Sequence, residues 1–115
     1  MDRKFILPLL LVAGLAGCVT PREGPRWEFV GRPLRVQAAS GGVSTLFLRP
    51  DGTVEARFGE NRLAGTWDFR GGNLCYTWPS ANNLRECWTH TAPFVPGRTE
   101  TIRSDRGNVV RVTME

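Results

Sequence analysis

From Trp27 onward the sequence shows no helical repeat of apolar residues, and glycine or proline interrupts it at intervals of about 8 to 12 residues. Turn signals at that spacing are typical of an all-β sandwich or barrel. We therefore predict strands near residues 27–31, 33–38, 43–49, 53–58, 62–70, 73–78, 84–90, 98–104 and 108–114. The predicted fold is a small antiparallel β-meander that closes, or nearly closes, into a barrel, because closure removes exposed strand edges.

A first hairpin is predicted around Pro50-Asp51-Gly52. Proline suits the first position of a type I turn, and glycine suits the position after it that needs a positive φ. Pairing Arg49 with Thr53 then sets the register. The cross-strand pairs on one face become Leu48 with Val54 and Leu46 with Ala56.

A second hairpin is predicted around the two-residue turn Gly71-Gly72. Its register gives the cross-strand pairs Phe69 with Leu74, Trp67 with Tyr76, and Gly65 with Trp78. All six residues share one face, and a slip of one residue would scatter them over both faces. The ring of Trp78 is expected to cover the bare backbone at Gly65.

The N-terminal segment has the pattern of a secretory signal peptide. It begins with Arg3 and Lys4 and continues through the apolar stretch 5–16. This stretch is too short to cross a bilayer core, which needs about 20 residues. Residues 1–17 are therefore expected to be removed on export. Residues 18–26, with two prolines and no apolar period, are predicted as a tether, and residues 27–115 as the single folded domain.

Cys75 and Cys87 are placed symmetrically about Ala81, which lies in a loop-like segment. If the two cysteines face each other, Leu74 meets Trp88 and Trp78 meets Leu84, which extends the same apolar face. Directly opposed antiparallel residues have Cα atoms about 4.5–5.5 Å apart, within reach of a disulfide. Because an exported protein enters an oxidising compartment, we predict a Cys75–Cys87 disulfide.

The sequence offers little support for catalysis, a metal or nucleic acid. His90 is the single histidine and is interpreted as a solvated residue at a strand end. No serine lies in a Gly-x-Ser-x-Gly context, and no set of zinc ligands is spaced for binding. The net charge is only +4, and the arginines are scattered rather than clustered. We therefore predict a protein that is not an enzyme, holds no cofactor and binds no nucleic acid.

The predicted domain is rich in aromatic residues. Trp67 is predicted as the buried anchor of the core, while a ligand carrier would need a void lined by Trp67, Tyr76 and Trp78. Glu86 falls on the apolar face beside Tyr76, where an unpaired charge would be costly. Either water reaches it, an arginine pairs with it, or it faces a ligand. Tyr76, Trp78 and Glu86 are thus the candidate ligand-facing residues.

Leu15-Ala16-Gly17-Cys18 resembles the lipobox of bacterial lipoproteins. The resemblance implies cleavage before Cys18, diacylation of its thiol and acylation of the new amine, with chains such as palmitate. It also leaves Cys75 and Cys87 as an even pair. Val19 follows the cysteine, where aspartate would resemble an inner-membrane retention signal. The resemblance therefore implies a lipid anchor in the cell envelope, on the periplasmic face of the outer membrane.

Residues 63–88 resemble small lipocalin-like domains of exported bacterial proteins, through Gly65-Thr66-Trp67, Leu74-Cys75-Tyr76-Thr77-Trp78 and Cys87-Trp88. The stretch 46–53, an apolar strand followed by Asp-Gly-Thr, is similar to a hairpin common in such proteins. The resemblance implies a lipocalin-like barrel. We predict that this envelope lipoprotein binds a partner protein or a small apolar ligand. The alternative is a lipocalin-like inhibitor of a protease or other hydrolase, acting through the tether or through residues 79–83.

Overall fold

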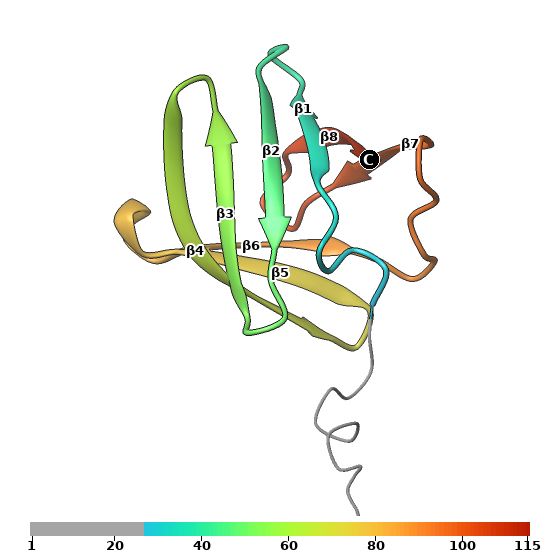
Figure 1. The fold of residues 1–115 in the computed structure, drawn as a ribbon, viewed down its shortest axis with the longest axis horizontal. Helices are drawn as coiled ribbons and strands as arrows, with labels where there is room; N and C mark the ends of the chain where they lie inside the picture. The colour runs from blue at the N-terminus through green and yellow to red at the C-terminus, as the bar shows by residue number, and fades with distance from the viewer. Residues whose placement is uncertain (1–26) are drawn as a thin grey trace, which may run out of the picture.

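Eight antiparallel strands form one sheet that curves into a nearly closed barrel in the computed structural model, which describes residues 27–115 (Figure 1). The strands are β1 (Leu34–Ala38), β2 (Val43–Leu48), β3 (Thr53–Phe58), β4 (Asn61–Arg70), β5 (Asn73–Trp78), β6 (Leu84–Thr89), β7 (Thr99–Arg103) and β8 (Val109–Met114). A short 3-10 turn, η2 (Pro79–Ala81), links β5 to β6. The predicted all-β barrel is confirmed, whereas the predicted signal peptide 1–17, the acylated Cys18 and the tether 18–26 lie outside the described residues.

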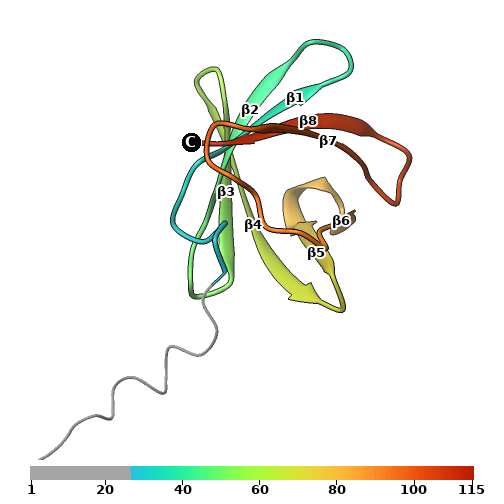
Figure 2. The same cartoon turned by 90° about the vertical axis from the view of Figure 1, so that its right-hand side faces the viewer.

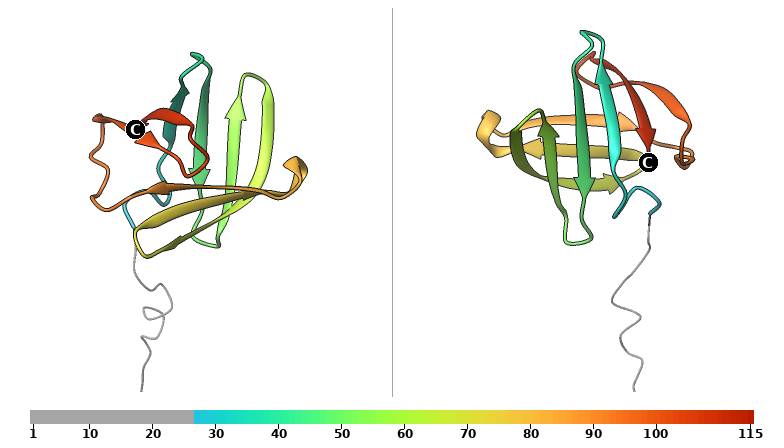
Figure 3. Two further views of the ribbon diagram at one scale, coloured as in Figure 1. Left: turned by 180° about the vertical axis from the view of Figure 1, so that it is seen from behind. Right: turned by 45° about the horizontal axis from the view of Figure 1, so that its top comes forward.

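The sheet order is β6-β5-β4-β3-β2-β1-β8-β7, which is a meander whose last hairpin returns to pair with β1. β6 and β7 are therefore the two free edges, and the sheet curls until they approach each other (Figure 2). β5 and β6 cross β2 and β3 at a steep angle (Figure 3). Among residues 27–115 no helix is long and apolar enough to span a membrane.

The turn after β7 closes the seam between the two edges. Trp88 of β6 forms an isolated antiparallel bridge with Ser104. The backbone N–H of Cys87 donates to Oδ1 of Asp105 at 2.9 Å, and the N–H of Asp105 donates to the carbonyl of Cys87 at 3.0 Å. These two hydrogen bonds satisfy the backbone N–H and carbonyl of Cys87, which lie on the free edge of β6.

The predicted registers are confirmed. In the β2–β3 hairpin Leu48 lies opposite Val54, and the N–H of Arg49 donates to the carbonyl of Thr53 at 2.9 Å. Gly52 has a φ of +89°, as the predicted turn requires. The other predicted pairs are also present: Leu46 with Ala56, Trp67 with Tyr76, Phe69 with Leu74, Leu74 with Trp88, and Trp78 with Leu84.

Gly65 accommodates the ring of Trp78, as predicted. A Cβ placed on this glycine would lie 2.6 Å from ring atom Cε3 of Trp78 and 2.5 Å from the carbonyl oxygen of Thr77. Both distances are shorter than van der Waals contact allows, and the second involves backbone. Glycine is therefore the residue that lets the indole of Trp78 pack directly against the backbone of β4.

The predicted first strand, 27–31, is wrong. These residues form a turn, closed by a hydrogen bond from the N–H of Val30 to the carbonyl of Trp27, and only Val30 makes an isolated bridge to Leu48. The alternating aromatic pattern has a different cause. Phe29 is completely buried and packs edge-on against Trp67 and Phe69, with ring centroids 5.6 and 5.5 Å away. The segment plugs one end of the barrel instead of adding a strand.

Trp67 is not the fully buried anchor that the sequence predicted. It is partly exposed at the plugged end, where its indole Nε1–H donates to the carbonyl of Arg49 at 2.8 Å. The most deeply buried side chains are instead Phe29, Leu34, Leu48, Val54, Leu74, Val112 and Met114. The indole N–H accounts for the difference, because its hydrogen-bond partner is a carbonyl next to the β2–β3 turn and a tryptophan N–H needs such a partner.

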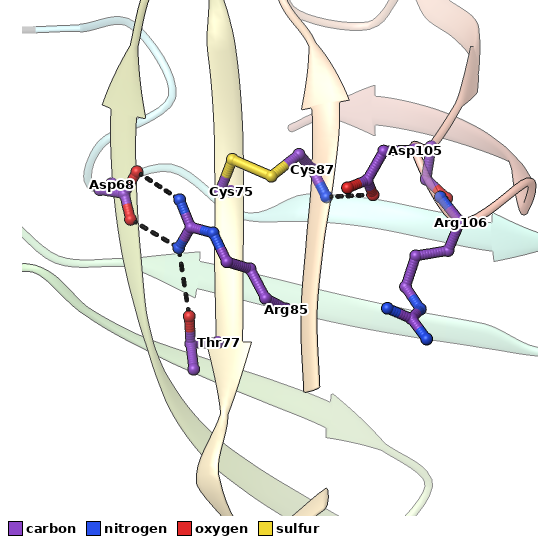
Figure 4. The surroundings of a disulfide bond; sticks show 8 residues. Asp68, Cys75, Thr77, Arg85, Cys87, Asp105 and Arg106 are labelled. Carbon is purple, nitrogen blue, oxygen red and sulfur yellow. Dashed lines mark hydrogen bonds and ion pairs between the residues drawn. A yellow bond between two sulfur atoms is a disulfide. The ribbon is translucent and has the colours of Figure 1, made fainter. Parts of the chain in front are cut away.

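The predicted Cys75–Cys87 disulfide is present, with the two Cα atoms 4.0 Å apart (Figure 4). Strand alternation places it on the outer face of β5 and β6, opposite to inward-facing Leu74 and Tyr76. Next to it Arg85 binds Asp68 through two hydrogen bonds of 2.9 and 3.1 Å, which lower the pKa of the Asp68 carboxyl. The covalent and ionic links together join β4, β5 and β6.

Candidate ligand-binding cavity

A cavity of about 490 Å³ opens at the end of the barrel opposite to the aromatic plug. Its volume falls in the range of roughly 300–1,000 Å³ that is usual for small-molecule sites. The lining reaches the β1–β2 turn through Ser40, the end of β3 through Phe58, and the β7–β8 turn through Asn108. The β1–β2, β3–β4 and β7–β8 turns, which lie at or next to these three residues, form the mouth. The walls below it are mainly apolar and include Val36, Leu46, Ala56, Leu63, Trp88 and Val110.

The three candidate ligand-facing residues, Tyr76, Trp78 and Glu86, all line this cavity. Trp67, the third residue of the predicted void, does not line it. The meander explains the grouping, because Tyr76 and Trp78 alternate inward on β5 and Glu86 lies directly opposite Tyr76 on β6. The strand register thus brings two of the three residues of the predicted void, together with Glu86, into the lining.

Tyr76 is fixed in the cavity wall by its aromatic neighbours. Its ring stacks on Trp78, with centroids 6.0 Å apart, and meets the edge of Trp88 at 4.9 Å. The side chain is only 2% exposed, and its hydroxyl makes no hydrogen bond to any described atom. Burial, together with the charge of Glu86, raises the pKa of Tyr76 well above its usual value. The wall thus contains a neutral phenol whose hydroxyl has no hydrogen-bond partner among the described residues.

Glu86 supplies the one charge among the residues that line the cavity. It is partly buried, and its Oε2 accepts a hydrogen bond from Nδ2 of Asn108 at 2.7 Å. Among residues 27–115 no arginine forms an ion pair with it. A carboxylate has about four lone-pair positions, and one amide leaves acceptor capacity for a further donor.

Asn108 is the residue of this site that the sequence analysis missed. It ends the β7–β8 turn, which Ser104 holds in place. The hydroxyl of Ser104 accepts hydrogen bonds from the N–H groups of Arg106 and Asn108, each at 3.2 Å. This turn reaches Glu86 only because the seam brings β7 and β8 beside β6. Cross-strand counting within single hairpins cannot find a contact between residues 22 positions apart in sequence.

The rim of the mouth is apolar. Phe58 and Val109, which both line the cavity, are 40% and 37% exposed. Val43, 47% exposed, precedes Ser44 of the lining. Two of the four large exposed apolar side chains of the described residues thus lie at the opening, where an apolar ligand would enter, whereas Val43 itself is not among the lining residues.

His90 is not the solvated strand-end residue predicted from the sequence. It is 8% exposed, its Nε2 lies 2.6 Å from Oε2 of Glu28, and its ring lies 4.3 Å from that of Phe94. The same Glu28 oxygen accepts from the N–H of Phe94 at 3.0 Å. These contacts tie the plug to the chain after β6, which is a structural role. Among residues 27–115 no group of three or more histidine, cysteine or acidic residues is arranged to hold a metal ion.

Comparison with known proteins finds no match to this chain among family models, curated protein sequences or solved structures.

Proposed function

We propose that the barrel binds a small, mainly apolar ligand in its open cavity and does so without chemical conversion, as the exported domain of an envelope lipoprotein. The observation that carries the proposal is the cavity itself: it is open at one end, walled by apolar side chains and edged by one carboxylate. A barrel whose only task were structural would gain stability from filling this space, since each buried methylene contributes about 0.8 kcal/mol.

The unused hydroxyl of Tyr76 supports the same proposal. A buried polar group without a partner costs roughly 1–3 kcal/mol, so each one in a native protein calls for an explanation. Phenylalanine would keep the ring contacts with Trp78 and Trp88 and avoid this cost. Because the hydroxyl oxygen is itself buried, a polar group of a ligand would reach it after a shift of the side chains around it.

The position of the mouth fits a protein tethered at its N-terminal side. The described chain begins at Trp27, at the plugged end, and the β1–β2 and β3–β4 turns lie at the opposite end (Figure 1). An anchor at Cys18 would attach the plugged end to the membrane. The mouth would then open toward the aqueous compartment, where a ligand or a partner protein could reach it.

The alternative of a hydrolase inhibitor depends on a protruding segment. The β5–β6 turn at residues 79–83 is exposed and polar, with Asn82 and Asn83 both at positive φ. It presents no apolar anchor of the kind that dominates protein interfaces. The cavity is therefore favoured over this turn as the binding site.

A cavity-filling variant tests the proposal. The full chain, held in phosphatidylcholine nanodiscs, is titrated with 1-octanol while tryptophan emission is followed, and empty nanodiscs give the fraction of octanol taken up by lipid. Trp78 and Trp88 line the cavity, so a bound ligand should change the emission until it saturates. Ala56→Phe places a ring inside the cavity and should abolish the saturable change.

Ala64→Phe is the matched control, because Ala64 is exposed on the outer face of the neighbouring strand β4. It should bind octanol as the original protein does. If Ala56→Phe fails to fold, Ser44→Phe at the mouth serves in its place. An original protein that shows no saturable change, or a change equal in Ala56→Phe and Ala64→Phe, would contradict binding in the cavity.

A further inference from the structure

We infer that Glu86 makes the cavity selective for aliphatic ligands with a cationic or hydrogen-bond-donating polar end, such as a primary amine, over those that end in a carboxylate. This inference rests on the proposed function and adds the class of ligand. The geometry is simple: apolar walls take the chain of the ligand, and one carboxylate stands where its polar end must lie.

The position of Glu86 is fixed rather than free. The residue lies directly opposite Tyr76 in the β5–β6 register, and Asn108 holds its Oε2 from the β7–β8 turn at 2.7 Å. The remaining lone pairs can accept from an ammonium or a hydroxyl group. A carboxylate ligand could offer no proton to them and would bring a second negative charge into a partly desolvated space, where repulsion between like charges is strong.

The arginines of the β3–β4 hairpin and of β6 do not offset this charge. Arg57 and Arg62, which flank the β3–β4 turn, are both engaged with Glu55 on the outer face, at 3.3 and 3.6 Å. Arg85 is the cross-strand neighbour of Thr77 and binds Asp68, also on the outer face (Figure 4). The lining therefore stays acidic in a chain whose net charge is +4. The charge of the whole molecule would predict the opposite preference.

Three ligands with the same eight-carbon chain test the selectivity: octylamine, 1-octanol and octanoate. Each is titrated at pH 7 into the full chain in phosphatidylcholine nanodiscs, with empty nanodiscs used to correct for uptake by lipid. Octylamine should bind on the order of tenfold more tightly than octanoate, with octanol between them. The reason is that the carboxylate of Glu86 attracts an ammonium group and repels a carboxylate near the protein surface.

Glu86→Gln should remove the order by weakening octylamine and strengthening octanoate, with octanol changed least. Glu60→Gln is the matched control: it removes the same charge from the exposed β3–β4 turn, outside the cavity lining, and should keep the original order. The series on the unaltered protein tests the preference even if Glu86→Gln fails to fold.

The outcomes separate the two proposals. If octanoate binds as tightly as octylamine, or if Glu86→Gln leaves the order unchanged, the selectivity is refuted while binding in the cavity stands. If none of the three ligands gives a saturable change in tryptophan emission, the proposed function fails, and the selectivity fails with it.

Discussion

The ring and the hydroxyl of Tyr76 have opposite effects on the stability of the barrel. Its ring contributes to the core through Trp78 and Trp88, whereas its hydroxyl contributes no hydrogen bond among the described residues. The two parts of one side chain thus act in opposite directions on the free energy of unfolding. Truncations of buried side chains usually destabilise a protein, but removal of an unpaired buried hydroxyl is an exception.

Tyr76→Phe should therefore leave the free energy of unfolding unchanged or raise it by about 1 kcal/mol, because an unsatisfied group is removed and the ring is kept. Urea denaturation monitored by circular dichroism measures this change. The same variant should bind 1-octanol more weakly if the hydroxyl serves the ligand. A loss of stability would show that the hydroxyl has a partner in the folded protein and would weaken the argument for a ligand.

At this scale the sequence predicted neighbours along a strand pair but not contacts across the seam. Glu86 was placed beside Tyr76 by counting outward from Ala81, and the pairing is present. Asn108 and the Glu28–His90 contact were missed, since they join residues 22 and 62 positions apart in sequence. Such contacts follow from barrel closure and from the plug, and neither has a local signature in the sequence.

The β5–β6 hairpin is the element on which the cavity most depends. Its inner face carries Tyr76, Trp78 and Glu86, and β6 is an edge strand whose far side approaches β7 and the turn after it. On its other side β6 pairs with β5 along its whole length, and the Cys75–Cys87 disulfide links these two strands covalently. The local hairpin pattern allowed the strand pairing of this element to be predicted. The segment 27–31 was mistaken for a strand because alternating aromatic residues fit both a strand and a buried turn.

Replacing both cysteines by alanine should lower the free energy of unfolding by roughly 2–4 kcal/mol, the effect expected for a closed loop of this length. Urea denaturation of the full chain gives the value, with the original protein before and after reduction as the control. Because β6 would be held less firmly, 1-octanol should also bind more weakly. Free thiols at Cys75 and Cys87 in the unfolded, unreduced protein would contradict the bridge.

The whole molecule is a barrel with two unlike ends. One end is closed by Trp27, Phe29 and Phe94 around the Glu28–His90 contact, and the other opens into the cavity. The closed end also receives the chain from its N-terminal side. This polarity could not be predicted from the strand pattern, because up-and-down strands give both ends the same kind of turn and only the packed side chains distinguish them.

The difference between the two ends would matter for function if the protein is anchored at Cys18. We expect the mature protein to begin at Cys18, with acyl chains on its thiol and amine, because several chains hold a protein at a membrane stably whereas one is marginal. Mass spectrometry of the N-terminal peptide from the membrane fraction tests this, and the unmodified precursor mass is the reference. Residues 18–26 could then extend at most about 3.3–3.6 Å each, which keeps the plugged end near the bilayer and the mouth farther from it. An unmodified Cys18, or cleavage at another position, would contradict the anchor and with it the proposed orientation of the cavity.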